Sequence, residues 1–313
     1  MKQPSHYVTD WLDKRAKLTP DRVALIDYAT GSETTFAEWN ERANRTANYL
    51  RSLGIAKGDR VAVYAMNRPE YLDLFWAAPK IGAMLQNLNW RLTLHELTGI
   101  VESGEPKLLV FSDDRRAQAA QLAATCVSVE HRVAMGAACD GEIALSEREK
   151  LPDTLGERPD LGLDDPWGIY YTGGTTGLPK GAVLTHGNVT WNSVNTVTSW
   201  GIHAGHKAPL QMPFFHIGGP HIFMTAMVHV GATTILVPIA ISIALATGAN
   251  PTMYALIIAL STSNAFILPT HQVNALIMGP GGYRVADFIR AGGLMSVIFI
   301  VVMLTMVNLM FGT

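Results

Sequence analysis

One stretch, residues 170–181, constrains this chain more than any other part of its sequence. It reads YYTGGTTGLPKG, and its first residues end a short apolar run, Trp167 to Tyr171, that is typical of a buried strand. Glycine lets the backbone approach an anion closely and turn its N–H groups toward it. Threonine and lysine add donors, and each charge-assisted bond to a phosphate contributes roughly 1.5–3 kcal/mol. The stretch therefore predicts a phosphate-binding loop, with a flexible, threonine-rich surface loop as the simpler alternative.

The predicted phosphate ligands are Thr172, Gly173, Gly174, Thr175, Thr176, Gly177 and Lys180. Their spacing differs from that of a Walker A loop, G-x-x-x-x-G-K-[ST]. The stretch instead resembles the phosphate-binding signature of the adenylate-forming superfamily, the acyl-CoA synthetases and their relatives, in which Y/F-T-S-G-T-T-G-x-P-K-G is usual. Gly173 stands where serine is commoner in that family, which removes one hydroxyl.

This resemblance implies an ATP-dependent carboxylic acid–CoA ligase. In that family ATP and a carboxylic acid give an acyl-adenylate and pyrophosphate, and coenzyme A then displaces AMP. The implied cofactors are ATP, Mg²⁺ and coenzyme A, and the implied substrate is a small-molecule carboxylic acid, in the first place a fatty acid. Lys180 is the implied catalytic residue, because its charge would balance that of the departing pyrophosphate.

Other stretches carry the same resemblance. The sequence N-W-R-L at residues 89–92 is similar to the N-x-R-L stretch of fatty acyl-CoA synthetases, and we interpret Asn89 and Arg91 as structural bracing. The sequence P-F-F-H-I-G-G at residues 213–219 resembles a family pattern that borders the acyl pocket, which makes His216 and Gly218 substrate-pocket candidates. Several nearby histidines suggest a metal site as an alternative. Their spacings match no zinc signature, so no metal site is predicted.

Alternating strand and helix patterns predict an α/β fold for this part of the chain. Capping boxes at Thr35 and Thr93 open helices, because each threonine is followed three residues later by glutamate. Apolar runs at residues 60–65 and 107–111 predict strands. Residues 117–165 are interpreted as a solvated connection, because charged turns dominate them.

Charge is distributed unevenly along the chain. The net charge of −2 offers no basic field for a nucleic acid, so no nucleic-acid partner is expected. The two cysteines, Cys126 and Cys139, have no metal or redox spacing, which fits a reducing cytosolic compartment. Residues 238–313 carry only three charged side chains. We therefore predict an adenylating domain of residues 1–237, followed by a distinct segment of residues 238–313.

That second segment resembles the divalent-anion:sodium symporters, the sodium-coupled dicarboxylate and sulfate carriers. The sequence S-T-S-N-A-F-I-L-P-T at residues 261–270 carries the resemblance, which implies Na⁺ binding by Ser263 and Asn264 at a helix break. Residues 294–311 form an uncharged run of 18 residues, near the length that crosses a bilayer. We therefore expect a helical, transporter-like membrane segment within residues 239–311 and a membrane location with the N-terminal domain in the cytoplasm. A buried core helix is the alternative.

The function predicted from the sequence is an acid–CoA ligase by ancestry. Beyond Pro238 we recognise no magnesium-binding stretch, ribose-binding aspartate or lysine-bearing small domain of that superfamily. This leads us to expect an incomplete and inactive ligase. Two alternatives stay open, which are a fragment of a sodium-coupled transporter and a non-functional fusion of two incomplete proteins.

Overall fold

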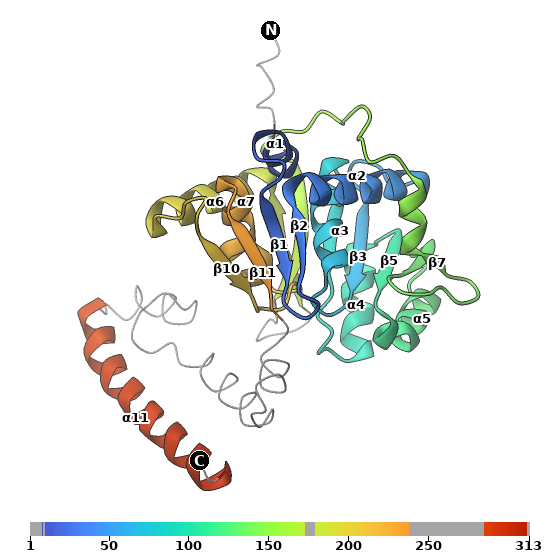
Figure 1. Ribbon diagram of the computed structural model, residues 1–313. Helices are drawn as coiled ribbons and strands as arrows, with labels where there is room; N and C mark the ends of the chain where they lie inside the picture. Colours follow the sequence, from blue (N-terminus) through green and yellow to red (C-terminus); the bar gives the residue numbers. More distant parts are fainter. Residues whose placement is uncertain (1–7, 9, 173–178, 238–284, 312–313) are drawn as a thin grey trace. The chain divides into compact units, whose positions relative to one another are not determined.

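The computed structural model describes residues 8, 10–172, 179–237 and 285–311, and the statements below concern these residues. The chain divides into two units, Met1–Val237 and Pro238–Thr313, which are described separately. Strands and helices alternate in the first unit, so the α/β part of the predicted fold class is confirmed (Figure 1). That the two units are independent domains stays a prediction.

A seven-stranded sheet forms the centre of the first unit, with the strand order β7-β6-β5-β3-β4-β8-β9. Its strands are β3 (Arg60–Tyr64), β4 (Met84–Asn87), β5 (Leu108–Phe111), β6 (His131–Ala134), β7 (Ile143–Ala144), β8 (Pro166–Thr172) and β9 (Lys180–Thr185). All neighbouring pairs are parallel except the antiparallel pair of β8 and β9. Because β3 lies between β4 and β5, the chain reverses its direction across the sheet after β4.

Helices cover both faces of this sheet (Figure 1). The helices concerned are α2 (Phe36–Ser52), α3 (Pro69–Lys80), α4 (Leu94–Gly104) and α5 (Arg116–Thr125). Val61 and Val63 of β3 belong to the buried cluster that includes α2 and α3, whereas Ala62 and Tyr64 belong to the cluster that includes α4 and α5. Successive side chains of a strand point to opposite faces. The continuous apolar sequence of β3 therefore serves two cores.

A smaller sheet with the order β10-β11-β1-β2 completes the first unit. Its strands are β1 (Val23–Asp27), β2 (Ser32–Thr35), β10 (Lys207–Leu210) and β11 (Thr233–Leu236). The helices of this part are α1 (Trp11–Leu18), α6 (His186–Trp200), the π-helix η3 (Pro220–Met224) and α7 (Thr225–Val230). Leu25 of β1 pairs in parallel with Thr234 of β11, so strands from the beginning and the end of this unit lie side by side.

The local helix signals are confirmed. Thr35 caps α2 and Thr93 caps α4, and in both cases the glutamate three residues later completes the capping box. Pro69 occupies the first turn of α3, where its missing N–H removes no intrahelical hydrogen bond.

The solvated connection predicted for residues 117–165 is wrong. This region contains α5, β6, β7 and the 3₁₀ segment η2 (Leu145–Lys150), and its Leu122, Val133 and Leu145 are fully or almost fully buried. The pattern is weak because the apolar residues of α5 are mostly alanines and β6 is short. Pairing with β5 supplies the order that the local sequence does not indicate.

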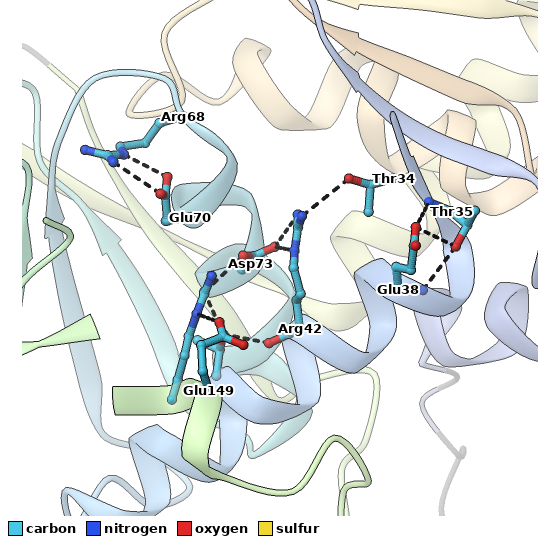
Figure 2. Close-up of polar contacts among 10 residues, drawn as sticks. Thr34, Thr35, Glu38, Arg42, Arg68, Glu70, Asp73 and Glu149 are labelled. Carbon is cyan, nitrogen blue, oxygen red and sulfur yellow. Dashed lines mark hydrogen bonds and ion pairs between the residues drawn. The ribbon is translucent and has the colours of Figure 1, made fainter. Parts of the chain in front are cut away.

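A buried ion-pair network joins α2, α3 and η2 (Figure 2). The carboxylate of Asp73 in α3 is 1% exposed and lies 3.0 Å from Arg42 Nη2 and 3.0 Å from Arg148 Nη1. Arg42 also donates to Thr34 Oγ1, and Arg148 donates to Thr46 Oγ1. The network therefore connects β2, both helices and the η2 segment by charge as well as by apolar packing.

The second unit is described only through α11 (Val285–Phe311). Within the described residues, no helix combines the length and the apolar character needed to cross a membrane. This finding contradicts the predicted helical membrane segment over its described part, Val285–Phe311, and with it the predicted membrane location. Residues 239–284 of that predicted segment lie outside the described residues. The run at residues 294–311 lies at the lower limit of the roughly 20 apolar residues that span a bilayer, and Ser296, Thr305 and Asn308 interrupt it with polar side chains.

Candidate functional site

The parallel strands β3, β4, β5 and β8 all end at one edge of the seven-stranded sheet. In open α/β sheets, ligands bind outside the carboxyl ends of the strands, where successive connections leave toward opposite faces. Here the connections reverse after β4, because β3 leads to α3 on one face and β4 leads to α4 on the other, and the switch point lies between β3 and β5. β8, which leads into the predicted phosphate loop, pairs directly with β4. This carboxyl edge is therefore the candidate site.

The predicted phosphate loop joins two antiparallel strands. Thr172, the last residue of β8, pairs with Lys180, the first residue of β9, and the Thr172 hydroxyl lies 3.5 Å from the Lys180 carbonyl oxygen. Both residues are exposed. The structure thus brings Thr172 and Lys180 together at the base of the loop. The other predicted phosphate ligands, Gly173, Gly174, Thr175, Thr176 and Gly177, lie outside the described residues, and the phosphate-binding role of the whole set stays a prediction.

The segment that carries His216 is held against the same edge. The side chain of Asn67, which follows β3, donates to the Met212 carbonyl oxygen at 2.8 Å and accepts from the Phe214 N–H at 2.9 Å. Phe215 packs edge-on against Trp90, which follows β4, with 5.8 Å between ring centroids. The segment therefore rests on the loops that follow β3 and β4.

His216 itself is exposed, and the fold constrains its ring through neighbouring glycines. Its Nδ1 accepts a hydrogen bond from the Gly218 N–H at 3.0 Å, so the neutral ring carries its proton on Nε2. Partial desolvation lowers the pKa of His216 below its usual value. A Cβ atom on Gly219 would collide with the Pro213 carbonyl oxygen, so the turn requires glycine there. The substrate-pocket role of His216 and Gly218 stays a prediction.

Two arginines stack on aromatic rings at this edge, and Arg115 is also ion-paired with Asp114 at 3.1 Å. The Arg91 guanidinium lies 4.9 Å from the Trp90 ring centroid and 5.8 Å from that of Phe215, and the Arg115 guanidinium lies 5.4 Å from the Trp90 ring. Such cation–π contacts hold a guanidinium in place without neutralising its charge. Arg91 is exposed. The expected bracing role of Arg91 agrees with this stack, which also leaves its charge available at the carboxyl edge.

A buried polar pair joins β8 to η3 and was not predicted from the sequence. The Tyr170 hydroxyl and His221 Nε2 are 2.9 Å apart, and these side chains are 3% and 4% exposed. Burial raises the pKa of Tyr170 and lowers that of His221 to about 3, so the ring of His221 is neutral near neutral pH. One signal was available in the sequence: a tyrosine in a buried strand needs a partner for its hydroxyl.

The predicted ion ligands of the second unit, Ser263 and Asn264, lie outside the described residues. In the parts of the chain that the structure describes, no group of three or more His, Cys, Asp or Glu side chains is arranged to hold a metal ion. His203 and His206, two members of the histidine-rich stretch, stack on each other with 3.8 Å between ring centroids.

Comparisons with known proteins agree with this geometry. Residues 12–260 match the sequence model of the family described as AMP-binding enzyme. A feruloyl-CoA synthase of Amycolatopsis is 33% identical over 228 residues, which are 72% of this chain and 43% of that protein. A long-chain-fatty-acid–CoA ligase of Mycobacterium tuberculosis is 33% identical over 215 residues, which are 66% of this chain and 40% of that protein.

Among solved structures, ATP-bound MatB from Rhodopseudomonas palustris superposes with a TM-score of 0.63 at 29% identity, over 72% of this chain and 45% of that one. The chain thus spans less than half the length of these three relatives. The family match passes Val237, the last residue of the first unit. None of these findings supports the transporter-like tail, its sodium site, or the expectation of an incomplete and inactive fusion.

Proposed function

The chain belongs to the family of AMP-binding enzymes, and from that premise we propose that its first unit binds ATP as part of a carboxylic acid–CoA ligase. The observation that carries the proposal is the position of Thr172 and Lys180, which face each other at the base of a glycine- and threonine-rich loop. This loop follows a strand at the carboxyl edge of the sheet, next to the point where the connections reverse.

The donors at this edge suit the phosphates of ATP. Thr172 and Lys180 are exposed and pair with each other across the two strands, and the glycines of the loop would add backbone N–H groups. An oxygen of the acid would attack the α-phosphorus and release pyrophosphate, whose charge Lys180 would balance. The thiol of coenzyme A would then attack the acyl carbon and release AMP. Mg²⁺ would accompany the phosphates of ATP, and we assign no described residue to it.

The acid would lie near the turn formed by residues 213–219. In its neutral form His216 carries a proton on Nε2, which can donate to a carboxylate oxygen. Gly219 has no Cβ, which lets its backbone approach the Pro213 carbonyl oxygen closely and keeps the turn tight. Two relatives are named feruloyl-CoA synthase and long-chain-fatty-acid–CoA ligase, and a third, of Aromatoleum aromaticum and 30% identical over 232 residues, is named indoleacetate–CoA ligase. We therefore propose a carboxylic acid of the aromatic or fatty class. A fatty acid is the narrower prediction.

The first test measures binding of Mg²⁺–ATP to the full chain by titration calorimetry. Replacing Lys180 with alanine should weaken binding about tenfold or more, because one charge-assisted hydrogen bond to a phosphate is lost. Lys207→Ala is the matched control, because Lys207 is also an exposed lysine at the first position of a strand. Equal affinities for the Lys180→Ala and Lys207→Ala variants would refute the role of the loop.

The second test measures the exchange of labelled pyrophosphate into ATP, which reports formation of the acyl-adenylate. Ferulate, indoleacetate and a long-chain fatty acid are added separately, and the acid that fits should stimulate the exchange. Stimulation by an aromatic acid alone would correct the narrower prediction of a fatty acid. No stimulation by any of the three acids, together with intact ATP binding, would contradict the ligase activity.

A further inference from the structure

His221 makes hydrogen bonds to three segments, which are β8, α6 and the 213–219 turn. Its Nε2 lies 2.9 Å from the Tyr170 hydroxyl on β8, the strand that enters the loop. Its carbonyl oxygen accepts from Asn192 Nδ2 at 2.7 Å, and Asn192 lies on α6, the helix that follows the strand leaving the loop. Its backbone N–H donates to the Ile217 carbonyl oxygen at 3.3 Å, within the turn that carries His216.

The surroundings of His221 hold it in one place. Its ring lies 5.3 Å from the Phe75 ring and 5.3 Å from the Tyr170 ring, between centroids. It belongs to η3, a single π-helical turn, and such turns occur frequently at functional sites. Its Nδ1 has no hydrogen-bond partner among the described residues, so the bond to Tyr170 is the one that its side chain makes there. A buried hydroxyl or imidazole that loses its partner is destabilised.

Tyr170 transmits this restraint to the loop. Thr172 follows it by two residues in β8 and therefore extends from the same face of the strand. Thr172 is also the last paired residue of β8, opposite Lys180. The position of the Tyr170 hydroxyl thus influences where the paired end of the hairpin lies relative to the 213–219 turn.

We propose that His221 is a positioning residue that couples Thr172 and Lys180, the paired base of the predicted phosphate loop, to the turn that carries His216. Its ring holds the end of β8 through Tyr170, and its backbone joins the turn and α6 to the same point. Movement of the turn that would bind the acid would then shift Thr172 and Lys180. Movement of these two residues would likewise shift the turn. This inference rests on the proposed function, because it assumes that the loop binds ATP.

The experiment measures Mg²⁺–ATP affinity and thermal stability of the full chain and its variants. Tyr170→Phe removes a single oxygen atom, His221→Leu removes the ring nitrogen that is its partner, and the double variant removes both. We expect each single variant to weaken ATP binding roughly five- to tenfold and the double variant to be no weaker than the singles, because all three lose the same bond. His221→Gln places an amide near the position of Nε2, and its affinity should return to within about twofold of the unaltered chain.

Tyr49→Phe is the matched control. Tyr49 is also buried, and its hydroxyl donates to the Ala144 carbonyl oxygen at 3.1 Å, but it lies on α2 and its partner ends β7, at the opposite edge of the sheet from β8 and β9. This variant should lower the melting temperature by about as much as Tyr170→Phe and leave ATP affinity unchanged.

The outcomes separate the two proposals. Unaltered ATP affinity in the Tyr170→Phe variant overturns the coupling and leaves the proposed function standing. A loss of affinity in Tyr49→Phe that matches the loss in Tyr170→Phe also overturns it, because both tyrosines would then only brace the core. Failure of the unaltered chain to bind ATP overturns both the proposed function and the inference.

Discussion

At the scale of single residues, Asp73 is the charge on which the packing of the first unit depends. Its carboxylate is almost completely buried and contacts two arginines from different elements, Arg42 and Arg148 (Figure 2). Removing one partner of a buried ion pair leaves the other charge uncompensated in a low-dielectric interior. The ion pair between Lys17 and Asp13 differs in this respect, because water reaches both of its side chains.

We therefore predict that Asp73→Asn lowers the free energy of unfolding by about 3–5 kcal/mol, because Arg42 then loses its counter-charge and Arg148 keeps only the exposed Glu149. Asp13→Asn removes an exposed pair on α1 and should cost less than about 1 kcal/mol. Urea unfolding of both variants, followed by fluorescence, checks this. Similar losses in the two variants would show that burial does not strengthen the Asp73 network.

At the scale of elements, the start of α2 shows how a helix is fixed by its first residues. The Thr35 hydroxyl accepts from the Glu38 N–H at 3.2 Å, and the Glu38 carboxylate accepts from the Thr35 N–H at 2.8 Å (Figure 2). These bonds satisfy backbone donors that have no partner within the helix. They also hold the Glu38 carboxylate near the positive end of the helix and lower its pKa.

Thr35→Ala should lower the free energy of unfolding by about 1 kcal/mol, because the hydroxyl that caps α2 is lost. Thr35→Ser keeps a hydroxyl at the same position and should stay within about 0.5 kcal/mol of the unaltered chain. Chemical unfolding of the two variants side by side gives the comparison. An equal loss for serine and alanine would mean that the methyl group, and not the cap, stabilises this position.

At the scale of the whole first unit, buried histidines make the fold sensitive to acid. His186 is 2% exposed, and neither of its ring nitrogens has a hydrogen-bond partner among the described residues. Burial lowers its pKa from 6.5 to about 4, although the nearby Asp165 and Asp10 act in the opposite direction and Arg158 and Lys57 act in the same one. His221 is shifted in the same direction, also by burial.

The pH dependence follows from this shift. The folded state binds the His186 proton only near pH 4, whereas the unfolded chain binds it near pH 6.5. The contribution of the neutral ring to stability is therefore complete above pH 6.5 and is lost as the pH falls toward 4. Between pH 7 and pH 4.5 the loss is on the order of 2–3 kcal/mol.

We expect His186→Gln to reduce the difference in unfolding free energy between pH 7 and pH 4.5 by about 2–3 kcal/mol, since glutamine does not titrate. His95→Gln, at an exposed position, is the control and should leave the difference unchanged. Urea titrations at the two pH values provide the measurement. If the pH dependence is the same for His186→Gln and His95→Gln, His186 does not cause the acid sensitivity.

The sequence by itself determined the features that depend on neighbours along the chain. The capping boxes at Thr35 and Thr93 and the strand that leads to Thr172 are short-range, because a hydroxyl, a glutamate three residues later or a run of apolar residues acts within a few residues. The phosphate loop was predicted for the same reason, and its binding role stays a prediction. The number of apolar residues at 294–311 led to a wrong prediction of a membrane-spanning helix. Crossing a membrane also depends on the length and polarity of the helix that forms.

Only the tertiary structure decided which distant residues meet. Tyr170 and His221 are 51 residues apart, and Asn67 and Phe214 are 147 apart. Neither pair has a local signal, because strand order and helix packing bring its members together. The same reason explains why residues 117–165 were misinterpreted: β6 is ordered by pairing with β5. Strand order also decided that the loop after Thr172 and the turn at His216 share one edge, since parallel strands end on the same side of a sheet.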